Sequence, residues 1–404
     1  MRHTTLTPLA LCASAVAAVA NTRQPAERPS VLPPAITQPD TPAWKTVAGE
    51  PERHRLQLVI RTPVEVAGQL TFDRWAFRHG AEYFYPASTI KLFAAIAAVE
   101  RFNDLAERHG AEWPLTTTLR WHDGPDSAHG AATTTLERET RKLFVVSDNP
   151  AYNRCYEFAG RTHINQRVRA IGCHSTRIAH RLSVGRTAEQ NRRTPRVEIV
   201  EDEDVVAAAP AQRCDLTLTN EGVPGLRVGS ARIAGGARLE EPLDFTGFNA
   251  TSLDDLQTTL IALTEPASDA HAALRLSRTQ RARLVEAATI LPCQSPDPIY
   301  NSVSYPDGYV KFLLPGLLRV RPLDEWRITN KVGLAYGFVT ENARVEHVPT
   351  GRRLFVAATL YTNPNETLND GVYAYDDLAL PFLSDLGESV GRALVALEEP
   401  APPK

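Results

Sequence analysis

Ser88-Thr89-Ile90-Lys91 opens a run with helical periodicity that continues to Leu105. Ser88 and Lys91 are three residues apart, so on a helix their side chains lie on one face. The lysine amine can then reach the serine hydroxyl and take its proton, which makes the serine nucleophilic. The segment therefore predicts a serine nucleophile at the start of a helix.

Lysine is rare in this chain, which makes Lys91 informative. The 404 residues include 44 basic side chains, and six of them are lysine. Arginine stays protonated whereas a buried lysine can lose its proton, so a retained lysine suggests a position that arginine cannot fill. A serine–lysine pair at this spacing also arises by chance in roughly one such chain in four, so companion motifs are needed. The lysines are Lys45, Lys91, Lys142, Lys311, Lys331 and Lys404.

Composition predicts a globular protein that binds no nucleic acid. The chain is 43% hydrophobic and 23% charged, with a net charge of −3, which are ordinary values for a folded domain. A basic surplus typical of nucleic-acid binding is absent. The cysteines and histidines lack metal-ligand spacing, so we expect no metal site. We also expect no organic cofactor. We expect a monomer of one large domain or two intimate ones.

Residues 1–20 are predicted to be a secretory signal peptide. A short positive start precedes an apolar run that is too short to span a bilayer and ends in Ala18-Val19-Ala20, before Asn21. We therefore expect a periplasmic or secreted protein without a membrane span.

Two further features of the N-terminal region and the cysteines follow from this prediction. Cys12 would suggest a lipoprotein, but the preceding Leu11 is too bulky for a good lipidation site. Residues 21–50 are rich in Pro, Thr and Ala and are predicted to form a flexible tether. Export permits disulfides, although their pairing stays open, and we expect free buried thiols for at least two cysteines. The four cysteines beyond residue 20 are Cys155, Cys173, Cys214 and Cys293.

Strand-like segments lie near both ends of the chain, and helix-like segments lie between them. The strands are expected at residues 55–62, 72–85, 326–329, 336–339, 343–347 and 353–360. The helices are expected at residues 91–105, 135–146, 150–160, 164–171, from 252 onward, 277–289 and 376–397. We therefore predict an α/β fold of the α+β type. Residues 51–86 and 300–400 form its sheet lobe, and residues 87–299 form a helical lobe with a β-rich insertion at about 195–249.

Two companion motifs follow the Ser88 helix. Ser147-Asp148-Asn149 precedes a proline and could supply a proton-relaying hydroxyl and a carbonyl-binding amide, although such residues also cap helices. A glycine at the end of Lys331-Val332-Gly333 would let a ligand approach the backbone closely. Lys331 would add a fixed positive charge, although alone the segment is an ordinary strand with a surface lysine.

The three motifs together, in this order, resemble the penicillin-recognising serine hydrolases, which include the class A β-lactamases and D-alanyl-D-alanine peptidases. Class A is the closer match, because Asn153 follows the second motif at the spacing of that class's structural asparagine. The resemblance covers residues 55–397 without the insertion. It implies an antiparallel sheet with flanking terminal helices plus a helical lobe.

The resemblance implies catalytic roles for four side chains. Ser88 would be the acylated nucleophile, and Lys91 would activate it. Ser147 would pass a proton to the departing nitrogen, and Lys331 would attract a substrate carboxylate.

The resemblance also implies a substrate site around Asn149, Val332, Gly333 and Leu334. Asn149 would bind the substrate's side-chain amide. The backbone N–H groups of Ser88 and Leu334 would form an oxyanion hole, where the loss of one donor costs roughly 3 kcal/mol.

Two departures from the family pattern bear on turnover and on substrate. Class A enzymes use a glutamate in a Glu-x-x-x-Asn setting to hydrolyse the acyl-enzyme, and this pattern is missing. Glu189 is the carboxylate near the expected loop and is the candidate base, unless it is a surface residue. Val332 replaces the usual Thr or Ser, so carboxylate binding should weaken by about 1–3 kcal/mol.

The sequence therefore predicts an exported serine hydrolase that cleaves a β-lactam or a related amide through an acyl-Ser88 intermediate. Two alternatives stay open. One is a D-alanyl-D-alanine peptidase or an esterase on the same fold. The other is a penicillin- or peptidoglycan-binding sensor that is acylated slowly or not at all, and the Val332 substitution together with the uncertain base favours it.

Overall fold

A six-stranded antiparallel sheet is the centre of the computed structural model, which describes residues 30–396. The strands are hydrogen-bonded in the order β13-β15-β16-β1-β2, and β14 pairs with the first three residues of β15. Gln57 lies opposite Thr359, so strands from the two ends of the chain are neighbours. The strands are β1 (Gln57–Val66), β2 (Gln69–Phe77), β13 (Trp326–Asn330), β14 (Gly333–Ala335), β15 (Phe338–His347) and β16 (Arg352–Tyr361).

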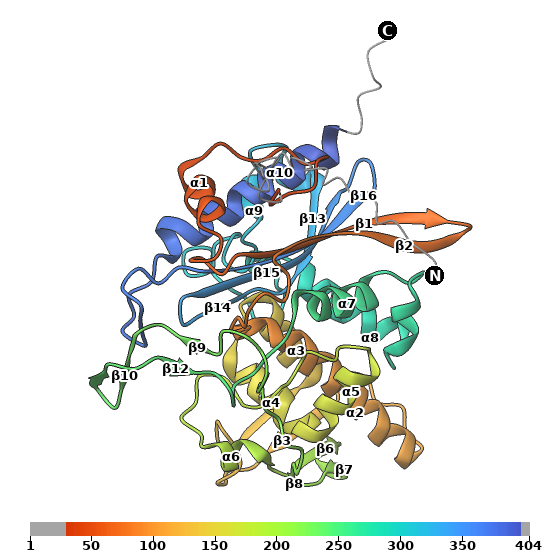
Figure 1. Cartoon of the computed structure of the whole chain (residues 1–404). Helices are drawn as coiled ribbons and strands as arrows, with labels where there is room; N and C mark the ends of the chain where they lie inside the picture. The colour runs from red at the N-terminus through yellow and green to blue at the C-terminus, as the bar shows by residue number, and fades with distance from the viewer. Residues whose placement is uncertain (1–29, 397–404) are drawn as a thin grey trace, which may run out of the picture.

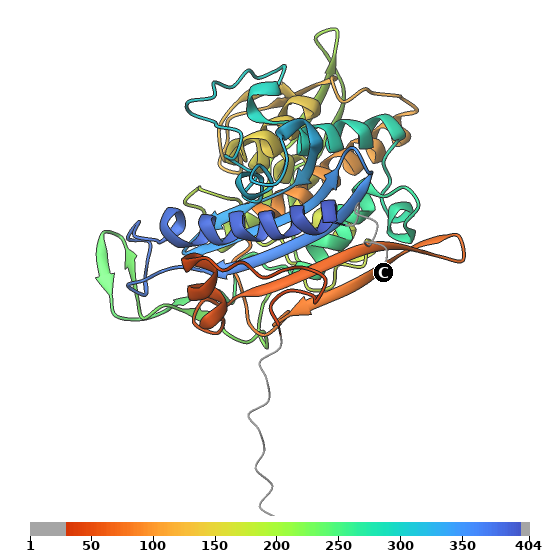
Figure 2. The same cartoon turned by 90° about the horizontal axis from the view of Figure 1, so that it is seen from above.

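Helices cover both faces of this sheet (Figure 1). On one face lie α1 (Pro42–Gly49), α9 (Leu314–Leu317) and α10 (Leu380–Ala396). Figure 2 shows α10 running across the sheet. Because both faces are covered, β16 is buried along most of its length rather than on alternate residues. The predicted α+β fold, with a sheet, terminal helices and a helical lobe, is confirmed.

The other face of the sheet packs against the helical lobe (Figure 1). Its central helix α2 is buried along most of its length, as its alanine-rich sequence allows. A single turn, η1 (Ala87–Ile90), leads into α2. The helices of this part are α2 (Lys91–His109), α3 (Leu136–Val145), α4 (Asn149–Ala159), α5 (Arg161–Ala170), α6 (Ala188–Arg192), α7 (Leu253–Thr264) and α8 (Arg278–Thr289).

The prediction of a flexible tether is wrong for residues 30–50. Thr41 caps α1, and Trp44 stacks on Phe382 of α10 with ring centroids 4.7 Å apart. Val47 is also buried against the sheet. Apolar side chains spaced among the prolines therefore anchor this segment, which composition alone did not reveal. Residues 1–29, including the predicted signal peptide and Cys12, lie outside the described residues.

Residues 195–249, predicted as a β-rich insertion, contain only short strands. The first two extend a small sheet of the helical lobe, in the order β4-β3-β6-β7. A later pair forms an outlying ribbon that reaches β17 (Thr367–Leu368). The strands of these small sheets are β3 (Thr118–Trp121), β4 (Ala132–Thr135), β5 (Arg193–Thr194), β6 (Val197–Glu201), β7 (Asp204–Ala209), β8 (Gln212–Arg213), β9 (Arg227–Val228), β10 (Ala231–Ala234), β11 (Ala237–Leu239) and β12 (Leu243–Asp244).

One predicted strand is half a turn. Of residues 336–339, Phe338 and Val339 begin β15 as expected, but Tyr336 and Gly337 have φ angles of 55° and 82° and join β14 to β15. Gly337 accepts this left-handed backbone readily, and the small residue supports the tight reversal.

The described cysteines are free, with three buried and Cys293 exposed. Within residues 30–396, none of the helices has the length and apolar character needed to cross a membrane.

Candidate active site

Ser88 lies in η1, at the point where the chain leaves the sheet and enters α2. Its side chain is half-buried, and its hydroxyl forms no hydrogen bond with any described residue. Ala87, directly before it, has a φ of 45°, an unfavourable backbone for a residue with a Cβ. The packing around η1 therefore holds the backbone directly before the serine in a strained conformation, and Ser88 lines two adjoining pockets of about 520 and 530 Å³.

Lys91 is fully buried at the first turn of α2. Its Nζ donates to the Ser147 carbonyl, to Ser147 Oγ at 3.2 Å and to Asn149 Oδ1 at 2.7 Å. Burial, and then the nearby charge of Lys331, holds the pKa of Lys91 well below its usual value. The lowered pKa makes this amine easier to deprotonate than an exposed lysine, as a general base requires.

Ser147 and Asn149 lie where α3 ends and α4 begins. Ser147 has a left-handed φ of 57°, which turns the chain sharply between the two helices. Asp148 accepts a hydrogen bond from Ala151 N at 2.6 Å and caps α4, which fixes the turn. The amide of Asn149 is shared, since its Nδ2 donates to Ser183 Oγ at 2.8 Å while its oxygen faces Lys91.

Lys331 approaches Ser147 from the sheet, between β13 and β14. Its Nζ donates to Ser147 Oγ at 2.9 Å and to the Val332 carbonyl at 3.1 Å. Burial lowers the pKa of Lys331 to about 7, with the Glu341 carboxylate partly opposing this effect. A single hydroxyl therefore connects the amines of Lys91 and Lys331.

Gly333 brings β14 against the backbone of η1. A Cβ at this position would collide with the Pro86 carbonyl and would lie 3.0 Å from Ser88 N. Glycine is therefore required for the close approach of the two backbones. Leu334, the next residue, lines both pockets that contain Ser88. The oxyanion hole formed by Ser88 N and Leu334 N stays a prediction that this approach supports.

Comparisons with known proteins agree with the fold. Residues 63–213 match the model of the β-lactamase enzyme family. A representative class A β-lactamase from Bacteroides cellulosilyticus superposes with a TM-score of 0.50 at 11% identity, over 87% of this chain and 96% of that chain. The chain is β-lactamase-like. The resemblance that the three motifs predicted is confirmed at this level.

Two other solved structures are similar to this β-lactamase-like chain. A β-lactamase from Burkholderia vietnamiensis has 17% identity and a TM-score of 0.49, over 88% of this chain and 97% of that one. A PBP-A variant, in an acyl-enzyme complex with penicillin G, has 17% identity and a TM-score of 0.46, over 86% and 93%. No curated protein matches the sequence.

Glu189 is not brought to the site of this β-lactamase-like chain. Its side chain is 47% exposed and pairs with Arg193 at 3.2 Å and with Arg213 at 3.0 Å. Hydrogen bonds from Arg213 lower the pKa of its carboxyl. The prediction that Glu189 holds the hydrolytic water is therefore wrong, because the arginine-rich loop turns it to the surface.

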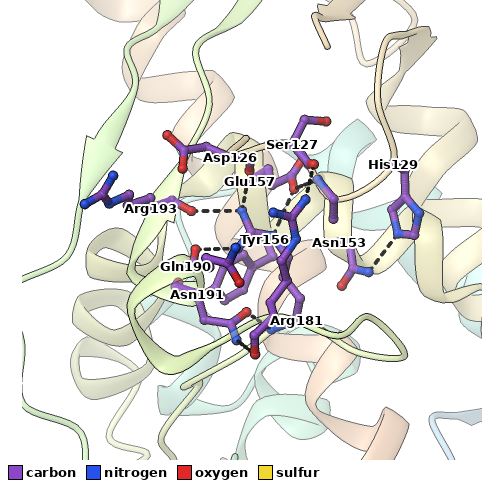
Figure 3. Close-up of polar contacts among 12 residues, drawn as sticks. Asp126, Ser127, His129, Asn153, Tyr156, Glu157, Arg181, Gln190, Asn191 and Arg193 are labelled. Atoms are coloured by element: carbon purple, nitrogen blue, oxygen red, sulfur yellow. Dashed lines mark hydrogen bonds and ion pairs between the residues drawn. The ribbon is translucent and has the colours of Figure 1, made fainter. Parts of the chain in front are cut away.

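A buried ion pair fixes the loop that carries Ser183, the hydrogen-bond partner of Asn149. Figure 3 shows Arg181 and Glu157 of this pair among their neighbours. Arg181 Nε donates to Glu157 Oε1 at 2.9 Å, and both side chains are 1% exposed. The remaining guanidinium N–H groups bond the carbonyls of Asp126, Gln190 and Arg193. Arg181 thus ties two loops to α4 and positions the backbone that carries Ser183.

Several lining residues of this β-lactamase-like cleft were not predicted. Ser183 lies within hydrogen-bond distance of Asn149, yet nothing local in its sequence marks it. Asp376 lines the pocket on the Val332 side, and it falls in a segment that was assigned only to the last helix. Four tyrosines line the pocket that contains Ser88 and Asn149, namely Tyr85, Tyr336, Tyr373 and Tyr375. The first two lie three residues from a motif in the sequence.

Proposed function

We propose that this chain is an exported serine hydrolase that forms a covalent acyl-Ser88 intermediate with a β-lactam or a related small amide. One observation carries the proposal. The Ser147 hydroxyl joins the buried amines of Lys91 and Lys331, beside a Ser88 hydroxyl that opens onto the cleft. Such a chain of groups can move a proton from an attacking oxygen to a departing nitrogen.

The acylation step follows from these positions. The Lys91 amine takes the proton of Ser88 as Oγ bonds the substrate carbonyl carbon. The resulting oxyanion would be held by the N–H groups of Ser88 and Leu334. The carbon–nitrogen bond then breaks, and the Ser147 hydroxyl gives its proton to the nitrogen. Ser147 regains a proton from the ammonium group of Lys91.

The two pockets beside Ser88 would hold opposite ends of the substrate. Asn149 lines one pocket and would hold the acyl side. Ser147 and Val332 line the other, which would hold the departing side. Lys331 attracts a carboxylate there, but Val332 offers it no hydroxyl. We therefore expect weaker recognition of that carboxylate than a threonine would give.

The second candidate function is a penicillin-binding or peptidoglycan-binding module that stays acylated. The pocket that contains Ser88 and Asn149 has no Asp or Glu among the described residues that line it. A water molecule beside the ester therefore lacks a carboxylate base on this side, which favours slow release. A D-alanyl-D-alanine peptidase or an esterase on this fold would use the same acylation step.

One pair of assays separates these functions. Purified protein is incubated with a chromogenic cephalosporin and, separately, with a fluorescent penicillin, using Ser88→Ala as the control. Turnover that is lost in the variant supports hydrolysis, and a stable label without turnover supports the binding module or a slow peptidase. A folded protein with neither label nor turnover would refute acylation at Ser88 by β-lactams.

We also propose that residues 1–20 are removed on export and that the protein acts in the periplasm or outside the cell. The N-terminal sequence of the protein from fractionated cells tests this. A mature protein that retains Met1 in the cytoplasm would contradict it.

A further inference from the structure

A third pocket, which we call the Arg161 pocket, adjoins the pocket that contains both Ser88 and Asn149. Its volume is about 520 Å³. Tyr85, Leu182, Ser183 and Tyr336 line both pockets, so the two share one wall. The other lining residues that matter are Arg161, His180, Arg186, Arg192 and Phe248.

Arg161 has no partner in this pocket. Its side chain is 6% exposed, and its Nε is buried without a hydrogen bond. Among residues 30–396, no side chain or carbonyl bonds its guanidinium, and no Asp or Glu lines the pocket. A buried charge without a counter-charge is costly. Arg161 therefore has the properties expected of a group that binds an anionic ligand.

The neighbouring arginines have partners. Arg181 pairs with Glu157. Arg186 bonds the carbonyls of Pro125 and Ser127, and Arg192 bonds that of Cys214 at 2.9 Å. The hydrogen bonds of these three side chains hold together the segments that they join. Arg161 is thus the guanidinium of this wall whose N–H groups make no hydrogen bond to any described residue.

His180 adds a second polar atom without a partner. Its Nδ1 donates to the Arg181 carbonyl at 2.6 Å, and its Nε2 is buried without a hydrogen bond. Burial lowers the pKa of the ring to about 4, so the ring is neutral at neutral pH and Nε2 accepts. A fitting ligand offers an N–H or O–H group near its anionic group.

Aromatic rings form the apolar part of the wall. The ring of His180 stacks parallel to Tyr85 and meets the ring of Phe248 edge-on, with centroids 5.4 Å apart. Leu218, Gly247 and Phe248 come from the 195–249 segment, so that segment closes this pocket. The pocket combines an unpaired cation with an aromatic surface.

We propose that the Arg161 pocket binds a carboxylate carried on the acyl side chain of the substrate, next to an amide N–H and an apolar group. The assignment to the acyl side rests on the proposed acylation of Ser88, because the pocket adjoins the Asn149 side of the cleft. The carboxylate pairs with the Arg161 guanidinium, and the amide N–H donates to His180 Nε2.

The first test measures anion binding without acylation. Ser88→Ala protein is titrated with phenylmalonate by calorimetry, and the same titration is made with Arg161→Gln added. Arg169→Gln is the matched control, since Arg169 is an exposed arginine on the same helix. We expect binding that Arg161→Gln weakens at least tenfold and Arg169→Gln leaves unchanged. Absence of binding, or equal binding by all three proteins, would overturn the carboxylate site.

The second test measures substrate preference. Carbenicillin and benzylpenicillin differ by one carboxylate on the acyl side chain, so the ratio of their second-order acylation rates isolates that group. We expect carbenicillin to be favoured at least tenfold, the ratio to fall to about one in Arg161→Gln, and Arg161→Lys to restore part of it. Equal rates in the wild-type protein, together with phenylmalonate binding, would overturn the assignment to the acyl side chain. If neither penicillin labels Ser88, the acylation proposal and the acyl-side assignment fail together, whereas the carboxylate site stands or falls on the calorimetry alone.

Discussion

At the scale of single residues, the rare lysines are the most informative side chains. Lys91 and Lys331 meet at the hydroxyl of Ser147, and burial depresses the pKa of both. Lys311 is a third buried lysine, which bonds Asn330 Oδ1 at 2.9 Å. Arginine could not lose its proton at these positions, which agrees with its absence there.

The charge of Lys331 gives a prediction for the pH dependence of acylation. Because its pKa is about 7, Lys331 is protonated below that pH and neutral above it. Acylation by a penicillin with a free carboxylate should therefore fall as pH rises from 6 to 8. The matching methyl ester, which has no charge to attract, should not show this fall. Measured rates that are flat with pH, or that fall equally for both compounds, would contradict the role of Lys331.

Gly333 gives a prediction about backbone geometry. Gly333→Ala should push β14 away from Ser88 N and slow acylation by about 100-fold, which is the usual effect of losing an oxyanion donor. Stopped-flow labelling measures the rate. Gly124→Ala is the control, because a Cβ there meets nothing within 4 Å. An unaltered rate in a folded Gly333→Ala protein would show that the oxyanion hole does not lie at this position.

At the scale of elements, the ion pair of Glu157 and Arg181 connects α4 to the loop beside Asn149. Glu157→Leu leaves a buried guanidinium without its counter-charge, so it should cost about 3–5 kcal/mol of unfolding free energy. The double variant Glu157→Leu/Arg181→Met should recover part of this loss, because both charges are then gone. Urea denaturation of the two variants measures the difference. A double variant less stable than Glu157→Leu would show that the carbonyl bonds of Arg181 matter more than its ion pair.

The elements also show what the sequence could predict. Ser88, Lys91, Ser147 and Lys331 were predicted together because each lies in a short motif with its own spacing. Glu189 was misassigned because its surroundings depend on Arg213, which is distant in sequence and reaches it only in the fold. The Arg161 pocket escaped prediction for the same reason, since residues from several elements close it.

At the scale of the whole molecule, the segment before β1 is part of the fold. Trp44 is almost fully buried between α1 and α10. Trp44→Ala should therefore cost about 3–5 kcal/mol of unfolding free energy, whereas Lys45→Ala on the exposed side of α1 should cost almost nothing. Thermal unfolding of both variants measures this. Equal stability of the two would show that α1 is dispensable.

The overall architecture was predictable because the first and last strands carry clear β-type patterns and the middle carries helical ones. The order of the strands was not predicted, because those patterns do not determine which strands pair. Residues 30–50 were misread because proline-rich composition outweighed a few apolar residues whose partners lie on α10, more than 300 positions away in sequence.

The burial of three lysines has a practical consequence for chemical footprinting. An amine-reactive ester would modify Lys45, whose side chain is 63% exposed, while the native packing shields Lys91, Lys311 and Lys331. With so few amines in the chain, each modified peptide in a mass spectrum reports on one place. Modification of Lys91 or Lys331 would therefore show that the cleft has opened. The many arginine side chains on the surface do not react with this reagent and add no background.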